Sequence, residues 1–313
     1  MDLSRKIYVA GHQGMVGSAI VRLLQAKGAT QLLLKSHQQL DLTQQHDVEQ
    51  FFSSEKPDYV FLAAAKVGGI YANNTYPAEF IYKNLAIQNN VIHNAYQSGC
   101  KKLLFLGSSC IYPRDCPQPI KEEYLLTGPL EQTNEAYAIA KIAGIKMCQA
   151  YRKQYSFDAI CTMPTNLYGP GDNFDLQTSH VLPALIRKIH DAKQTGAESV
   201  EIWGTGTPRR EFLHVDDLAN AALFLMQHFS SSEIINVGCG EDISIKELAM
   251  LIVRNIDYAG QLKFNTDKPD GTLRKLLDVS KIKSLGWQSS IPLNDGVAET
   301  MTWYENYARI PTT

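Results

Sequence analysis

A tyrosine and a lysine four residues apart form the pair in this sequence best suited to acid–base chemistry. The run Tyr-Ala-Ile-Ala-Lys at 137–141 lies in a stretch with a helical pattern, so the phenol and the ammonium share one helical face. A phenol that protonates a developing alkoxide needs its pKa, ordinarily about 10, brought towards neutrality, and a nearby cation does this by favouring the tyrosinate. We expect Tyr137 to be the proton donor and acceptor and Lys141 to supply that cation.

Chain order strengthens this interpretation, because the spacing alone also fits two incidental surface residues. An apolar stretch at Lys102–Gly107 ends in Ser108, and the helix of Tyr137 follows next. In a parallel α/β sheet the carboxyl ends of the strands line the ligand crevice. Ser108, Tyr137 and Lys141 are therefore predicted to converge there as one catalytic set.

A glycine-rich turn follows the first apolar stretch. Gly11, Gly14 and Gly17 come directly after Lys6–Ala10 and open a helical pattern. Such glycines permit a sharp turn, close approach of the backbone to a pyrophosphate, and packing of helix on strand. The alternative is a tight strand–helix turn with no ligand, but the position in the first βα unit favours dinucleotide binding.

The second predicted strand indicates which dinucleotide binds. It ends in Lys35-Ser36-His37, without the Asp or Glu that would hold a ribose 2′-hydroxyl in an NAD enzyme. Lys35 is instead suited to a 2′-phosphate, which favours NADPH. The competing interpretation makes Lys35 a solvated surface charge.

The elements that must position these residues alternate between strand and helix patterns up to about residue 165. This rhythm predicts βαβ units, and hence a Rossmann-type α/β fold with a doubly wound parallel sheet. We expect an NADP-binding domain at 1–165 and a smaller α/β substrate-binding part at 166–313, some segments of which return to the first domain. A capping box at 244–247 opens one of its helices. The predicted strands are Lys6–Ala10, Gln31–Lys35, Tyr59–Ala63, Lys102–Gly107 and Ala159–Met163.

Composition narrows the possible partners. The formal net charge is −2, which argues against nucleic acid or a membrane surface as partner. The six cysteines are scattered without metal-ligand spacing, so no metal site is predicted. The N-terminal residues lack the design of a signal peptide and no apolar run is long enough to span a bilayer, so we expect a cytoplasmic enzyme.

Six motifs together make the sequence resemble the extended short-chain dehydrogenase/reductases along nearly the whole chain. The resemblance implies an NADPH-dependent enzyme that epimerises C3 and C5 of GDP-4-keto-6-deoxy-D-mannose and then reduces C4, giving GDP-L-fucose. It also implies a homodimer that pairs through the helix at Asn84–Ser98 and the helix of Tyr137. The motifs lie at 10–18, 63–69, 106–113, 137–141, 164–170 and 210–217.

The resemblance also implies roles for a cysteine and a histidine. Removal of a proton beside the C4 ketone needs a base, and reprotonation from the other face needs an acid. Cys110 and His180 match these two roles in the family pattern, while Ser108 would hydrogen-bond the ketone. A lone cysteine is more often a small buried hydrophobe, and His180 would otherwise simply open a helix.

Binding residues follow from the same resemblance. Arg210 suits pyrophosphate oxygens and Trp203 suits packing on the nucleoside, although each would otherwise be an ordinary surface charge or core aromatic. The expected substrate contacts are Lys188, Trp203, Arg210 and Asp270. The expected cofactor contacts are Gly11, Gly14, Met15, Val16, Gly17, Lys35, Asp41, Leu42, Ala63, Ala65, Lys141, Pro164, Asn166, Leu167 and His180.

Other functions on the same fold remain as alternatives. A nucleotide-sugar 4,6-dehydratase needs acidic partners after the fourth strand, where this chain has no acid at 109–112. A 4-epimerase needs no thiol base, because it only passes hydride out and back. A cofactor-sensing regulatory protein would be expected to lose the tyrosine or the lysine, and both are present.

Overall fold

A six-stranded parallel sheet forms the centre of the computed structural model, which describes residues 1–268 and 270–308. All five predicted strands are present. The second contains two residues where five were expected, and a sixth, three-residue strand joins from beyond residue 165. In spatial order the strands are β10 (Ile235–Val237), β5 (Ala159–Pro164), β4 (Lys102–Leu106), β3 (Tyr59–Leu62), β1 (Ile7–Ala10) and β2 (Leu32–Leu33).

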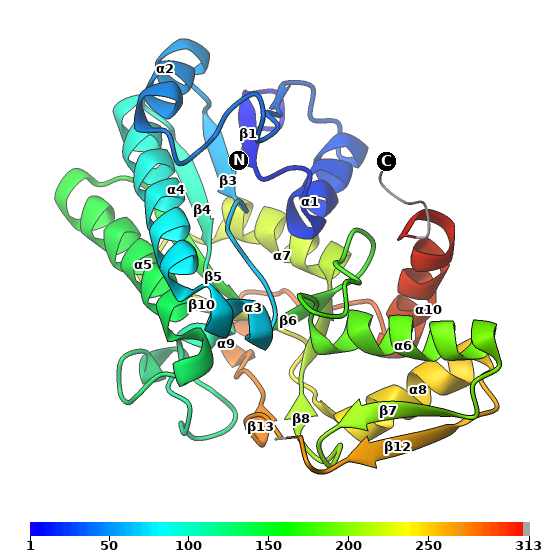
Figure 1. The fold of residues 1–313 in the computed structure, drawn as a ribbon. Coiled ribbons are helices and arrows are strands. Elements are labelled where there is room, and N and C mark those ends of the chain that lie inside the picture. The colour runs from blue at the N-terminus through cyan, green and yellow to red at the C-terminus, as the bar shows by residue number, and fades with distance from the viewer. Residues whose placement is uncertain (269, 309–313) are drawn as a thin grey trace.

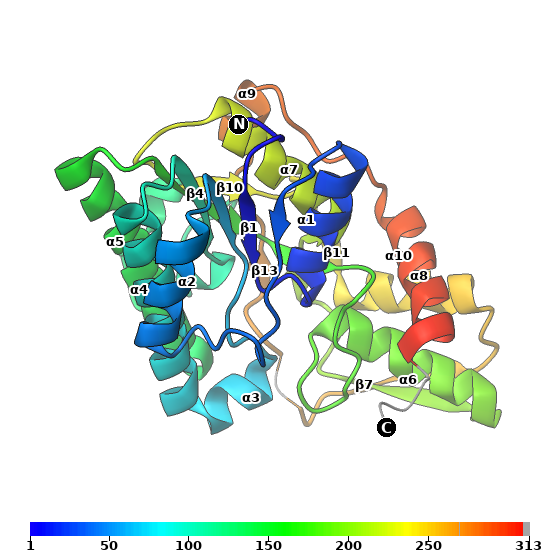
Figure 2. The ribbon, with the colours of Figure 1, turned by 90° about the horizontal axis from the view of Figure 1, so that it is seen from above.

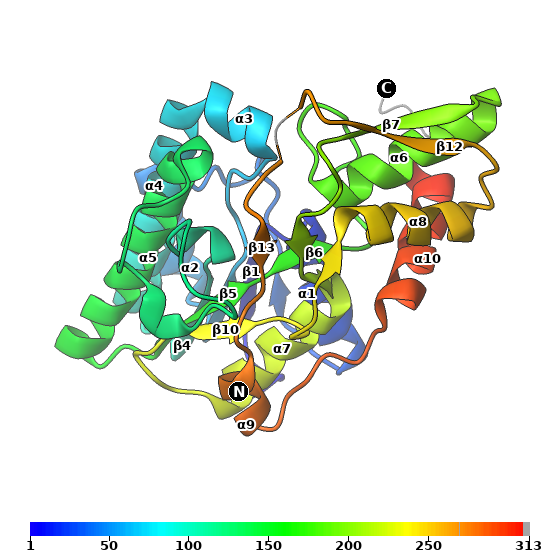
Figure 3. The same cartoon turned by 90° about the horizontal axis from the view of Figure 1, so that it is seen from below.

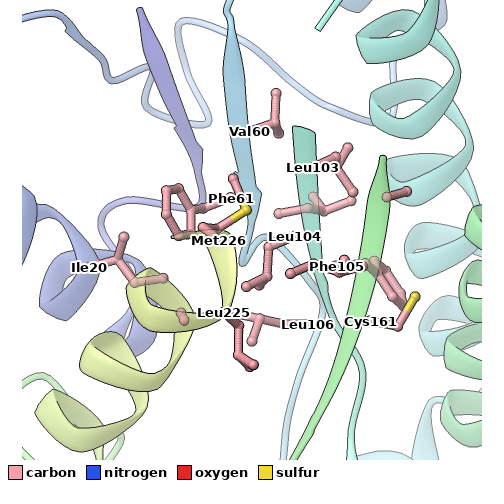
Figure 4. Close-up of a cluster of buried hydrophobic side chains, with 14 of the residues drawn as sticks. Ile20, Val60, Phe61, Leu103, Leu104, Phe105, Leu106, Cys161, Leu225 and Met226 are labelled. Atoms are coloured by element: carbon pink, nitrogen blue, oxygen red, sulfur yellow. The ribbon is translucent and has the colours of Figure 1, made fainter. Parts of the chain in front are cut away.

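Helices cover both faces of this sheet (Figures 1 and 2). One layer contains α2 (Gln45–Glu55), α4 (Pro77–Gln97) and α5 (Glu135–Tyr155), and the other contains α1 (Met15–Ala26) and α7 (Val215–His228). The strands are buried on both faces, as their continuous apolar sequences require. Ile20 of α1, Met226 of α7 and the strand residues Phe61 and Leu104 belong to one buried apolar cluster (Figure 4). The predicted Rossmann-type α/β fold is therefore confirmed.

A second, smaller core lies beside the sheet. It is formed by α6 (Val181–Thr195), α8 (Ile245–Ile256) and α10 (Leu293–Trp303), with the parallel pair β7 (Ser199–Trp203) and β12 (Gln261–Asn265). The predicted capping box opens α8: Ser244 Oγ accepts from the Glu247 N–H at 3.1 Å, and Glu247 Oε2 accepts from the Ser244 N–H at 2.9 Å.

No single cut in the chain separates the two cores. The helix α7, the strand β10 and the short helix α9 (Ser280–Ser284) all come from beyond residue 165, yet they pack on the central sheet. The remaining elements are α3 (Ile70–Thr75), η1 (Ser109–Ile111), η2 (Glu122–Tyr124), η3 (Gln132–Asn134), β6 (Asn166–Tyr168), β8 (Arg209–Arg210), β9 (Phe212–His214), β11 (Ile243–Ser244), β13 (Arg274–Lys275) and η4 (Tyr304–Ala308).

Candidate active site

The glycine turn has the shape that a dinucleotide diphosphate requires. Gly11 adopts φ +84°, and a Cβ there would lie 2.7 Å from the Ala64 nitrogen, so only glycine fits. A Cβ on Gly17 would lie 2.1 Å from the Gly11 oxygen, which shows how tightly α1 packs on β1. At Gly14, the N-cap of α1, a Cβ would approach only the Gly11 oxygen, at 3.5 Å. The backbone is therefore open where an anion would meet the helix N-terminus.

The other expected cofactor residues lie at or just beyond the strand ends. Lys35 and Asp41 follow β2, and Asp41 accepts hydrogen bonds from the backbone and hydroxyl of Thr43 at 2.9 and 2.8 Å. The Asn166 amide donates to the Glu211 carbonyl at 2.8 Å. Met15 and Val16 begin α1, Leu42 is buried, Ala63 and Ala65 follow β3, Pro164 ends β5, and Leu167 lies in β6.

Tyr137 and Lys141 lie on the first turns of α5, next to the end of β4. Lys141 is 4% exposed, its Nζ donates to the Leu106 carbonyl at 2.8 Å, and it lies 5.8 Å from the centre of the Tyr137 ring. The ring of Phe80 packs edge-on against Tyr137. Helix α5 thus brings the phenol and the ammonium together, as the spacing predicted.

The protonation of this pair differs from the expectation in one respect. Burial raises the pKa of the Tyr137 phenol, the Cys110 sulfur adds to this effect, and a hydrogen bond with Ser108 opposes it. Burial also lowers the pKa of Lys141 to about 8. The sequence predicted a lowered pKa for Tyr137, and the structure shows a raised one. The prediction failed because residue spacing carries no information about the cost of burying a charge.

Ser108 and Cys110 follow β4 in the short helix η1. Ser108 is the N-cap, and its Oγ accepts from the Cys110 N–H at 3.2 Å. Both side chains are partly buried, and η1 packs on α5. A third group reaches them from the C-terminal part of the chain, because Lys275 Nζ lies 3.7 Å from Cys110 Sγ. Sequence reasoning missed Lys275, which lies in a two-residue strand without a local motif.

His180 follows the loop at 169–179 and lies near enough to Lys275 for its charge to act on the imidazole. It is the N-cap of α6, and within the described residues its ring makes no capping bond. The Gly69 N–H donates to the Thr178 carbonyl at 2.8 Å, which ties this loop to the segment after β3. Part of the residue is exposed, but burial of the ring, together with the charge of Lys275, lowers the pKa of His180.

The expected substrate residues belong to the second part of the chain: Lys188 lies on α6, Trp203 ends β7, Arg210 lies in β8, and Asp270 lies between β12 and β13. Trp203 is 62% exposed, and the ammonium groups of Lys188 and Lys268 lie 5.3 and 5.4 Å from its ring centre. Lys268 was not anticipated, since its loop shows no periodicity. A flat ring flanked by two cations suits a nucleotide base next to a diphosphate.

Arg210 and Asp270 lie on adjacent segments. The Arg210 guanidinium donates to the carbonyls of Arg209 and Thr272 at 2.8 and 2.5 Å, and Asp270 accepts from the Thr205 N–H and hydroxyl at 2.9 and 2.7 Å. Burial lowers the pKa of Arg210, and the charge of Asp270 counters this. Each carboxylate oxygen keeps a second lone pair with which to accept a sugar hydroxyl.

These features are those of a nucleotide-binding α/β protein of the Rossmann type, with a candidate acid–base site at the carboxyl end of its sheet. The chain belongs to the NAD dependent epimerase/dehydratase family, whose model matches residues 7–238. None of the helices in the described part of the chain is long and apolar enough to cross a membrane.

The chain is also similar to individual members of that family. It is 63% identical to GDP-L-fucose synthase 1 of Arabidopsis thaliana, covering 97% of this chain and 94% of the relative, and 52% identical to GDP-L-fucose synthase of Escherichia coli K12, covering 97% and 98%. Among solved structures, the GDP-mannoheptose C4 reductase MlghC of Campylobacter jejuni with NADP bound matches with a TM-score of 0.89 and 44% identity, covering 97% and 99%.

Proposed function

We propose that this enzyme converts GDP-4-keto-6-deoxy-D-mannose to GDP-L-fucose, by epimerisation at C3 and C5 followed by NADPH-dependent reduction at C4. The observation that carries this proposal is the position of the Cys110 thiol, on the same short helix as Ser108 and against the helix of Tyr137. A proton-abstracting group thus lies beside a proton donor for reduction. Similarity to enzymes named GDP-L-fucose synthase along nearly the whole chain supports the substrate.

Epimerisation uses the acidity of the carbons that flank the C4 ketone. Cys110, as thiolate, takes the proton from carbon: the C–H bond breaks, an S–H bond forms, and the electron pair moves onto the ketone oxygen as an enolate. Ser108 donates a hydrogen bond to that oxygen. His180 returns a proton to carbon from the opposite face, which inverts the centre.

Reduction requires a proton at the C4 oxygen. NADPH, when bound, supplies the hydride. Tyr137 gives its phenolic proton to the developing alkoxide, and the hydrogen bond with Ser108 orients the phenol. Lys141, anchored on the Leu106 carbonyl at 2.8 Å, supplies a positive charge beside the resulting tyrosinate and would hold the nicotinamide ribose.

The residues around the glycine turn fit this cofactor. The open backbone at Gly14 would receive the pyrophosphate, and Lys35 after β2 would meet the 2′-phosphate. Asp41, Leu42, Ala63, Ala65, Pro164, Asn166 and Leu167 would line the rest of the cofactor site. A relative with 44% identity binds NADP in its solved structure, which supports the same choice here.

The substrate nucleotide would lie across the second part of the chain. Arg210 and Lys188 would neutralise the diphosphate, Trp203 would stack on the base, and Asp270 would accept from a ribose or sugar hydroxyl. The half-buried Arg210, which two carbonyls already hold in place, needs little further ordering to bind.

A C4 reductase without epimerase activity is the closest competing function, since a GDP-mannoheptose C4 reductase is among the similar structures. The test is to incubate the enzyme with GDP-4-keto-6-deoxy-D-mannose in D₂O without NADPH. We expect deuterium to enter at C3 and C5, and GDP-L-fucose to form when NADPH is added. Oxidation of NADPH without deuterium entry would establish a reductase only.

We also propose that two copies pair through α4 and α5 in the cytoplasm. On these helices Tyr82 and Ile139 are 67% and 42% exposed, which suits an apolar contact between copies. All six cysteines are free thiols, as a reducing compartment favours. Light scattering on Tyr82→Glu, which should shift a dimer to a monomer, tests the pairing.

A further inference from the structure

The ammonium group of Lys275 contacts the Cys110 sulfur from a distant part of the chain. Its Nζ lies 3.7 Å from Cys110 Sγ, across 165 residues of sequence. Within the described residues it forms no ion pair with a carboxylate, whereas lysines such as Lys66 and Lys281 do, with Glu79 and Glu233. Among the described residues, no carboxylate at ion-pair distance competes with the sulfur for this charge.

The strand that carries Lys275 is held firmly in place. The strand β13, labelled in Figure 3, pairs in parallel with β8. The residue after it bonds to the loop after η1: the Leu276 N–H donates to Gln118 Oε1 at 2.9 Å, and the Ile120 N–H donates to the Leu276 carbonyl at 2.7 Å. The buried carboxylate of Glu211 accepts from the Leu277 N–H at 3.0 Å. These bonds fix the lysine backbone relative to the cysteine.

We propose that Lys275 is a positioning residue that holds Cys110 in its thiolate form, ready to remove the protons at C3 and C5. A cation in contact with sulfur stabilises the thiolate relative to the thiol, and the thiolate is the basic form. The titratable groups near the sulfur are Tyr137, whose pKa the sulfur affects, and Lys275 itself. Tyr137 is neutral in the resting site, because burial raises its pKa.

The same charge also acts on the partner acid. Lys275 contributes to lowering the pKa of His180, so the protonated imidazole is a stronger acid, as return of a proton to carbon requires, while the same charge favours loss of the proton from sulfur. One lysine thereby biases both members of the epimerising pair. This inference rests on the proposed function for the chemistry, but the state of the thiol is a property of the free enzyme.

The test is the rate at which iodoacetamide alkylates Cys110 at pH 7, followed by mass spectrometry on the full chain without substrate. Because iodoacetamide reacts with the thiolate, we expect Lys275→Met to slow alkylation about tenfold. Lys275→Arg, which keeps the charge, should stay within about threefold of the unmodified enzyme. Cys239 provides an internal reference, and Lys283→Met, an exposed lysine on α9, is the matched control.

An unchanged alkylation rate in Lys275→Met would overturn the proposal, and so would equal slowing in Lys275→Met and Lys275→Arg. Lys275→Gln, checked for native circular dichroism, guards against a fold defect in the methionine variant. Deuterium entry at C3 and C5 should fall in parallel with alkylation. If alkylation slows as expected but the unmodified enzyme exchanges no deuterium, the role of Lys275 stands and the proposed epimerase function fails.

Discussion

The two sides of the candidate site are built in different ways. On the reductase side, Tyr137 and Lys141 project from a helix of 21 residues, and Lys141 is almost completely buried. On the recognition side, Arg210 lies in a strand of two residues, and Trp203 ends a strand of five with its ring mostly exposed. Proton transfer requires fixed geometry, whereas binding a large nucleotide requires an open surface. Substitutions on the first side should therefore affect kcat, and those on the second side KM.

Removal of the phenolic oxygen should give the largest effect. Tyr137→Phe deletes the proton donor to the C4 oxygen, so we expect kcat for NADPH oxidation to fall about 10³-fold with little change in KM. Steady-state kinetics checks this. Tyr155→Phe, at the far end of the same helix, should have no effect. If Tyr137→Phe kept full kcat, Tyr137 would not be the proton donor, and the contrast between the reductase side and the recognition side would fail.

Cys110 lies between the two sides, on the short helix η1. Cys110→Ser replaces a thiol by a much weaker acid, so deuterium entry at C3 and C5 should slow about 10²-fold. The dissociation constant for NADPH should remain unchanged. Cys116→Ser, in the loop after η1, is the control. If exchange continues at the normal rate in Cys110→Ser, another group is the base.

The same contrast separates what the sequence predicted from what it could not. Gly11 and Gly14 lie in the turn before the long helix α1, Gly17 lies within it, and the Tyr–Lys pair lies on the long helix α5, so sequence pattern and spacing placed these residues next to the elements that carry them. Lys275 and Lys268 come from segments too short for periodicity, and only tertiary contacts bring them to the site. The three-residue strand β10 escaped prediction for the same reason. The effect of burial on the pKa of Tyr137 likewise depends on packing, which spacing does not encode.

Burial of Lys141 should be visible in the pH dependence of stability. Burial lowers its pKa in the folded state to about 8, against an ordinary value of 10.5. Between these pH values the unfolded chain binds more protons, so the free energy of unfolding rises with pH. Relative to Lys141→Met, the unmodified protein should gain ~2 kcal/mol between pH 7.5 and 9.5 in urea unfolding. Lys146 is an exposed lysine on the same helix, so the unmodified protein should show no such gain relative to Lys146→Met. If the free energy of unfolding changes with pH in the same way for the unmodified protein and for Lys141→Met, the Lys141 amine is solvated in the folded state.

On the recognition side the expected effect is smaller and falls on KM. Trp203→Ala removes the ring that lies between Lys188 and Lys268, and loss of stacking on a base costs about 1 kcal/mol or more. We expect KM for the nucleotide-sugar to rise roughly fivefold to tenfold while kcat stays within about twofold, since the ring does not touch the reacting carbons. Met250→Ala, an exposed side chain on α8, serves as control. A fall in kcat at constant KM would show that Trp203 positions the sugar for reaction. The recognition side would then contribute to the chemical step as well as to binding.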